Sequence, residues 1–189
     1  MSKLNFEFDE FPQLKSERFV LREVKEQDYL ALFEIYSDED AVKYQQMGAM
    51  KTIEQAQKAV QAFLQGFKNR KFIRWCIATK KNDTVIGLIT LHHFDIWNSQ
   101  SEIGFMLNKR YWGQNIMGEV AHEIIRFAFA IIGLHRIEAL IHPNNIASIK
   151  LSEKLGFQIE GLKKEAAYNK RTDEYEDRLI LGITKNNKK

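Results

Sequence analysis

The segment 102–120 carries the residues whose order and spacing point most clearly to chemistry. It reads as an apolar strand, then a polar loop bounded by Gly113 and Gly118, and then an apolar helix. This order leaves free backbone N–H groups and the positive end of a helix dipole just beyond the end of a strand. Such an arrangement binds phosphate without a basic side chain, although the same order also occurs as a plain tight turn. The segment therefore predicts a phosphate site without naming its ligand.

Two common phosphate ligands do not match this loop. Gly113 and Gly118 have the spacing of a nucleoside-triphosphate loop, but Glu119 and Val120 stand where Lys and Ser or Thr would follow. A carboxylate there would repel the terminal phosphates, and no hydroxyl is placed to bind magnesium. The chain also contains no G-x-G-x-x-G, which a dinucleotide-binding fold needs for its first turn. A diphosphate held by backbone groups remains, and the pyrophosphate of coenzyme A fits that description.

The composition is that of an ordinary globular protein. The 189 residues suit one domain, which we expect to cover 1–189 with a core at about 16–183. Hydrophobic residues make up 44% and charged residues 28%, which is typical of soluble proteins. The formal charge is only +3 and the basic residues are dispersed. We therefore expect no nucleic-acid partner.

The single cysteine and the lengths of the apolar runs indicate where in the cell the protein is expected. Cys76 cannot form an intrachain disulfide, and its neighbours Trp75 and Ile77 predict a buried thiol in a strand. The stretch 1–11 has no apolar core of the kind found in signal peptides, and no apolar run reaches membrane-spanning length. We therefore expect a cytoplasmic protein without a membrane partner.

The elements that must position the 102–120 segment follow from periodicity and turn residues. Their order predicts an α/β fold with a mixed, largely antiparallel central sheet of about seven strands and helices on both faces. The polar loop 37–51 is a plausible wall for a second substrate. The predicted strands are 18–24, 72–79, 85–94, 101–107, 136–141, one beginning at 157–160, and 175–183. The predicted helices are 27–36, 52–67, 119–132 and 145–155.

Two blocks of sequence, in the expected order, resemble the GCN5-related N-acetyltransferases, and in particular their ribosomal-protein N-terminal acetyltransferase branch. The first is Glu-Ile-Gly-Phe at 102–105 followed by Tyr-Trp-Gly-Gln-Asn-Ile-Met-Gly-Glu at 111–119. The second comprises Ile-Glu-Ala at 137–139, Pro-Asn-Asn-Ile-Ala-Ser at 143–148 and Glu-Lys-Leu-Gly-Phe at 153–157. The resemblance implies the fold of that family.

The pyrophosphate loop departs from the family pattern Q/R-x-x-G-x-G/A. Trp112, Asn115 and Met117 occupy its three defining positions. Trp112 is usual for the resembled branch. Asn115 is the sharper exception, but Asn tolerates the left-handed backbone region better than other non-glycine residues. We therefore expect the backbone to make the turn and coenzyme A to bind.

The resemblance implies an acyltransferase that uses acetyl-CoA as cosubstrate and no metal. An amine would attack the acetyl group directly in a ternary complex. The acceptor is a primary amine, either a protein N-terminus or a small molecule such as a polyamine, amino acid or antibiotic. A non-catalytic acetyl-CoA sensor is the alternative, and the oligomeric state is open between monomer and homodimer.

The resemblance also suggests catalytic residues. Glu102 is the candidate base. The alternative interpretation is that it is an exposed carboxylate at the end of a strand, without a catalytic role. His92 and His93 are adjacent in a strand, so we expect them to face opposite sides, with one of them, His92 in our assignment, as base or relay. For the acid we nominate Ser152, which stands where the family often has a tyrosine, with Tyr168 or water as alternatives.

The residues expected to contact acetyl-CoA come from the two blocks. Backbone N–H groups of 105–107 would donate hydrogen bonds to the oxygen of the acetyl group. Asn145 would cap its helix or bind the pantetheine arm. The full set is Phe105, Met106, Leu107, Trp112, Gly113, Gln114, Asn115, Ile116, Met117, Gly118, Glu119, Asn145 and Ser148.

Overall fold

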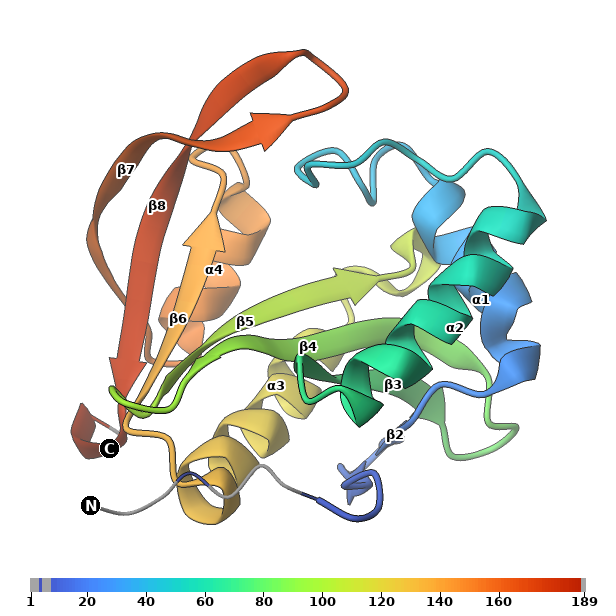
Figure 1. Cartoon of the computed structure of the whole chain (residues 1–189), viewed down its shortest axis with the longest axis horizontal. Coiled ribbons are helices and arrows are strands. Elements are labelled where there is room, and N and C mark those ends of the chain that lie inside the picture. The colour runs from blue at the N-terminus through green and yellow to red at the C-terminus, as the bar shows by residue number, and fades with distance from the viewer. Residues whose placement is uncertain (1–3, 5–7, 188–189) are drawn as a thin grey trace.

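A computed structural model describes residue 4 and residues 8–187, so the expectation for the stretch 1–11 lies in part outside the described residues. One sheet has the strand order β1-β2-β3-β4-β5-β6-β8-β7 (Figure 1). The strands are β1 (Leu14–Lys15), β2 (Phe19–Arg22), β3 (Phe72–Thr79), β4 (Val85–Asp95), β5 (Gln100–Leu107), β6 (Arg136–Ile141), β7 (Gln158–Asn169) and β8 (Glu174–Thr184). The helices are α1 (Tyr29–Ser37), α2 (Ile53–Lys68), α3 (Ile116–Phe127) and α4 (Ile146–Lys154). Short turns of helix are η1 (Glu26–Asp28), η2 (Lys109–Tyr111), η3 (Ala128–Ile132) and η4 (Lys185–Asn187).

The predicted sheet is confirmed, with one small addition. Every neighbouring pair of strands is antiparallel except β5 and β6, which are parallel. The eighth strand is β1, a two-residue pairing that is too short to leave a periodic pattern in the sequence. The helices cover both faces, with α1 and α2 on one side and α3 on the other (Figure 1).

The parallel pair positions the site because it is short. β5 and β6 pair only from Gln100 with Arg136 to Glu102 with Glu138. Beyond Glu102 the two strands diverge, and β5 runs toward α1 while β6 stays beside β8 (Figure 1). The remainder of β5 therefore has a strand partner only on its β4 side.

The core lies in two layers, one on each face of the sheet. Successive residues of β3 enter different layers, because they point to opposite faces of the sheet. Trp75 belongs to the same buried cluster as Ile124 of α3, whereas Cys76 belongs to the cluster that contains Leu32 of α1 and Val60 of α2. Cys76 is completely buried, as predicted, and burial raises the pKa of its thiol to about 12. This thiol is therefore a packing group.

Helix boundaries differ from the prediction at the point that matters most. The helix expected at 119–132 begins at Ile116, three residues earlier, and its end is wound as the π-helical turn 128–132. The early start follows from Asn115, whose left-handed backbone turns the chain directly into the helix. By contrast, α2 begins where expected, with the Gln55 side chain accepting a hydrogen bond from the backbone N–H of Thr52. Within the part of the chain that the structure describes, no helix is long and apolar enough to cross a bilayer.

Candidate functional site

A cavity of about 730 Å³ opens where β5 and β6 diverge. Its size is in the range of small-molecule sites. The wall from the N-terminal half is the loop 40–45, and α4 supplies the opposite wall. Twelve of the thirteen residues expected to contact acetyl-CoA line it, and these are Phe105, Met106, Leu107, Trp112, Gly113, Gln114, Asn115, Ile116, Met117, Gly118, Asn145 and Ser148.

The 112–118 loop presents backbone donors to this cavity. Gly113 has φ 75°, and Asn115 has φ 54° and ψ 23°, so the left-handed conformation expected of Asn115 is confirmed. The first backbone bond into the helix runs from the N–H of Glu119 to the carbonyl of Asn115. The N–H groups of 116–118 precede it and have no partner one helical turn back. They form the positive end of α3.

Two side chains hold the loop in place through hydrogen bonds. The Trp112 indole N–H donates to the Leu107 carbonyl at 2.9 Å and ties the loop to the end of β5. Lys154 Nζ donates to Asn115 Oδ1 at 3.0 Å. A Cβ at Gly118 would lie 2.7 Å from the same oxygen, so this glycine leaves room for the Asn115 side chain. Lys154 was missed in the sequence, where a lysine in the last turn of a helix reads as an ordinary partner of the helix dipole.

Glu119 does not line the cavity, although it was expected among the cofactor residues. Its carboxylate accepts hydrogen bonds from Ser16 Oγ, at 2.6 Å, and from the backbone N–H and Nε of Arg18. Burial disfavours ionisation of Glu119, but these donors outweigh it and lower its pKa. Arg18 in turn donates to the Gln114 carbonyl at 3.2 Å. Glu119 therefore supports the loop through Arg18.

α4 contributes one polar residue to the cavity and one to the core. Asn145 caps the helix by accepting a hydrogen bond from the Ser148 N–H at 3.2 Å, and both residues line the cavity. Ser152 lies one turn further along the helix and is fully buried. Its hydroxyl has no hydrogen-bond partner among the described residues, and it is not part of the cavity wall. The proposed acid is therefore not exposed to this space.

Glu102 is the last residue of β5 that pairs with β6, and two histidines lie beside it. His93 Nδ1 is 3.2 Å from Glu102 Oε1, and His92 Nδ1 is 3.9 Å from Glu102 Oε2. The expectation that the two histidines face opposite sides is wrong, since their Nδ1 atoms are 3.2 Å apart. The pairing of β4 with β5 shifts between His92 and Asp95, and His93 has φ 52°. This bulge turns His93 onto the face of its neighbour.

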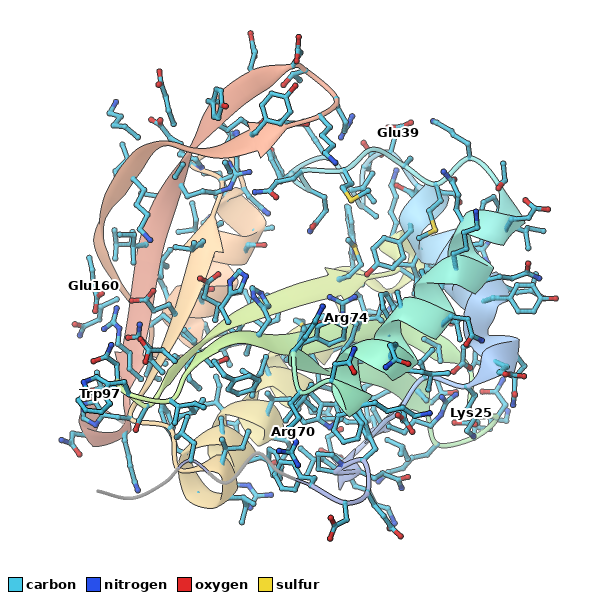
Figure 2. All side chains as sticks on the ribbon, in the orientation of Figure 1. Lys25, Glu39, Arg70, Arg74, Trp97 and Glu160 are labelled. Carbon is cyan, nitrogen blue, oxygen red and sulfur yellow. The ribbon has the colours of Figure 1, made fainter. Side chains whose placement is uncertain are left out.

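The loop 37–51 meets the β7–β8 hairpin across the opening. The Tyr44 hydroxyl donates to the Asn144 carbonyl at 2.9 Å, and the Lys170 N–H donates to the Gln46 carbonyl at 3.1 Å. Arg171 pairs with Glu39 at 3.4 Å, and Figure 2 shows Glu39 on this loop beside the hairpin. Tyr168, the alternative acid, donates to Asp173 and is not part of the cavity wall.

The observed groups fit a coenzyme A thioester. The left-handed Asn115 and the first turn of α3 form a concave row of N–H donors suited to a diphosphate. Lys154 adds one positive charge beside that row. The free edge of β5 at 105–107 offers backbone groups to an extended, amide-containing arm. The cavity joins these two features without interruption.

Comparison with known proteins places the chain among acetyltransferases. A family model described as "Acetyltransferase (GNAT) domain" matches residues 18–158. The uncharacterized N-acetyltransferase YoaA of Bacillus subtilis is 32% identical over 162 residues, which is 86% of this chain and 92% of YoaA.

Two solved structures share the fold at lower identity. The ribosomal-protein-S5-alanine acetyltransferase of Vibrio fischeri is 20% identical with a TM-score of 0.76, over 92% of this chain and 96% of that one. The spermidine N-acetyltransferase of Vibrio cholerae, solved with CoA and spermine, is 16% identical with a TM-score of 0.77, over 90% and 97%. Given the family match, the similarity to YoaA and the site geometry, the chain belongs to the GNAT family and is an N-acetyltransferase.

Proposed function

We propose that this protein transfers the acetyl group of acetyl-CoA to the N-terminal amine of a protein or peptide, by direct attack of the amine. The observation that carries the proposal is the arrangement along β5. The 112–118 loop follows one end of this strand, and Glu102 lies three residues, or roughly 10 Å, before Phe105 at the cavity. One strand therefore holds a diphosphate cradle and a carboxylate at the two ends of an acyl-transfer site.

Glu102 is the proposed general base. An attacking ammonium must lose a proton before its nitrogen can form a bond to the acetyl carbon. The Glu102 side chain is 23% exposed, so it is reachable by an amine yet only partly hydrated. As the C–N bond forms, the carbonyl oxygen gains negative charge, and backbone N–H groups of 105–107 on the free edge of β5 are its proposed donors.

The departing thiolate requires a proton once its bond to carbon has broken. Ser152 is fully buried, and a serine hydroxyl is a poor acid, so we assign this proton to water. Tyr168 donates its hydroxyl proton to Asp173 at the hairpin, so we do not assign the role to it. The proton taken by Glu102 returns to solvent after the amide has formed.

The charges around Glu102 favour an acceptor with a single ammonium group. Glu138, which pairs with Glu102 across β5 and β6, forms an ion pair with Arg136 at 2.8 Å. Glu176, further along β8 toward the hairpin, pairs with Arg178 at 2.9 Å. Glu102 has only histidines as ionic partners among the described residues. A polyamine carries several ammonium groups and needs several uncommitted carboxylates, whereas a peptide N-terminus needs one. The solved relatives act on both kinds of amine, so their common fold does not decide.

The test is a panel of amines with acetyl-CoA and purified protein, read out as thiol release. Peptides beginning with Ala or Ser should be acetylated faster than spermine, amino acids or aminoglycosides. Cys76 is buried and will contribute little to a thiol-reagent signal. Preference for a small amine would replace the peptide proposal, and acetyl-CoA binding without release on any amine would indicate a sensor.

A further inference from the structure

The His92–His93–Glu102 cluster has a feature that acetyl transfer does not require. Three different side chains each place one possible ligand atom within 4.8 Å of the other two. In the part of the chain that the structure describes, it is the only group of three His, Cys, Asp or Glu side chains arranged in this way. A base needs only the carboxylate, so the convergence of both imidazoles calls for its own explanation.

The strand register and a bulge in β4 bring the three side chains together. His92 pairs with Glu102 across β4 and β5, which places these two side chains on the same face. His93 joins them only because its left-handed conformation, with φ 52°, reverses the ordinary alternation of the strand. Ser101 Oγ donates to the His92 carbonyl at 2.7 Å and holds the strand at the start of the bulge.

The spacing of the donor atoms matches a metal site. Zinc bonds of about 2.0–2.1 Å in tetrahedral geometry place neighbouring ligand atoms roughly 3.3 Å apart. The two Nδ1 atoms are 3.2 Å apart, His93 Nδ1 is 3.2 Å from Glu102 Oε1, and His92 Nδ1 is 3.9 Å from the other carboxylate oxygen, Oε2. One ligand atom from each of the three residues lies within 4.8 Å of the other two. Two imidazoles and a carboxylate are ligands suited to zinc and similar divalent transition metals. Three protein ligands would leave one position open.

Access and charge also permit a cation. The His93 side chain is 74% exposed, so an ion reaches the cluster directly from solvent. Arg74 pairs with Thr90, two residues before His92 on β4, and so lies on the same sheet face and is the nearby positive charge. Its Nε donates to Thr90 Oγ1, and its guanidinium lies 4.1 Å from the centre of the Phe63 ring. It is therefore held by other groups, and the negative charge of Glu102 lies between the histidines and β6.

We propose that His92, His93 and Glu102 bind one divalent transition-metal ion of the zinc class and that this ion inhibits acetyl transfer. The inhibitory half rests on the proposed function, because a metal bound to the Glu102 carboxylate removes it as a base. The ion would then exclude an acceptor amine without affecting the 112–118 loop. The enzyme would be switched off by free zinc and switched on by a chelator.

The binding test uses untagged protein and zinc chloride in isothermal titration, with Co²⁺ absorption as a second readout of four-coordinate geometry. We expect one equivalent of zinc, and at least tenfold weaker binding to His93→Asn. Asn tolerates the left-handed backbone at this position, so the bulge should survive. His122→Asn removes an exposed histidine of α3 and is the matched control, with unchanged zinc affinity. Absence of one-to-one binding, or equal affinities in all three proteins, would overturn the metal site.

The inhibition test follows acetylated peptide by chromatography, because the CoA thiol and thiol reagents both bind zinc. Zinc should compete with the peptide but not with acetyl-CoA, and inhibition should be at least tenfold weaker in His93→Asn. Full activity at saturating zinc would overturn the inhibitory half and the assignment of Glu102 as base, while the binding site would stand. If the unsubstituted protein binds no zinc but Glu102→Gln loses turnover, the meaning is the opposite: the base would stand and the metal site would fall.

Discussion

The 112–118 loop and the His92–His93–Glu102 cluster adjoin the same strand, β5, but are built in different ways. The loop consists of consecutive residues, and its donors come from the backbone at the start of α3. The cluster consists of side chains from two strands, joined by register and a bulge. The loop therefore depends on local conformation, whereas the cluster depends on how distant residues pair. We propose that the loop binds acetyl-CoA and that the cluster provides the catalytic base. A substitution in the loop should therefore change affinity, and one in the cluster should change kcat.

The largest expected effect is on the cluster. Glu102→Gln keeps the shape of the side chain and removes the base, which should lower kcat by about 100-fold or more, the range of general-base catalysis. The affinity for acetyl-CoA should stay unchanged, because Glu102 is not part of the cavity wall. Steady-state kinetics with a peptide acceptor measures the effect, and Glu123→Gln on α3 is the control. Unchanged kcat would show that Glu102 is not the base.

Substitutions in the 112–118 loop should instead change the affinity for acetyl-CoA. Asn115→Val places a β-branched residue in the left-handed region at a cost of about 1–2 kcal/mol, so acetyl-CoA should bind about tenfold more weakly. Asn115→Gly permits the same backbone and should bind about as well as the unchanged protein. Isothermal titration compares the three. If their affinities are equal, the loop conformation does not contribute to cosubstrate binding.

A smaller effect is expected at Lys154, which reaches the loop from α4. Lys154→Gln removes one charge beside the proposed diphosphate, so affinity for acetyl-CoA should fall about three- to fivefold at low salt. The difference should shrink as salt is added, because exposed charges are screened. Lys150→Gln, also exposed on α4, is the control. A loss that is independent of salt, or equal in both variants, would argue against a phosphate contact.

The smallest effect is expected at Glu119, which supports the loop through Arg18, and it should appear in the free energy of unfolding. The pKa of Glu119 is lowered in the folded protein, so its bonds to Ser16 and Arg18 stabilise the fold above the ordinary pKa of a glutamate. This stabilisation is lost as pH falls through the lowered value. Glu119→Gln should therefore cost about 1 kcal/mol near pH 7 and less in acid, as measured by denaturant unfolding. A cost that does not change with pH would exclude this ionic role.

The same contrast explains what could be predicted from the sequence. Seven of the eight strands and the order of the elements follow from local patterns, and they are confirmed. The left-handed Asn115, expected from its place in the family's loop pattern, is confirmed as well. The arrangement of His92 and His93 could not be predicted, because a bulge is a property of strand pairing and leaves no periodic signal. Lys154 was missed for a related reason, since it approaches the loop from another element. Contacts within one segment can be predicted from the sequence. Contacts between segments can be predicted only when the pairing register of the strands is known.

The most direct test of the account is single-turnover acetylation of an Ala- or Ser-starting peptide, measured over a range of acetyl-CoA concentrations in three proteins. We predict that Glu102→Gln lowers the rate at saturating acetyl-CoA by about 100-fold and leaves the half-saturating concentration unchanged. Asn115→Val should do the reverse, with about tenfold more acetyl-CoA needed to reach a nearly normal rate. If both variants change the rate and the half-saturation together, the loop and the cluster do not divide binding and chemistry between them.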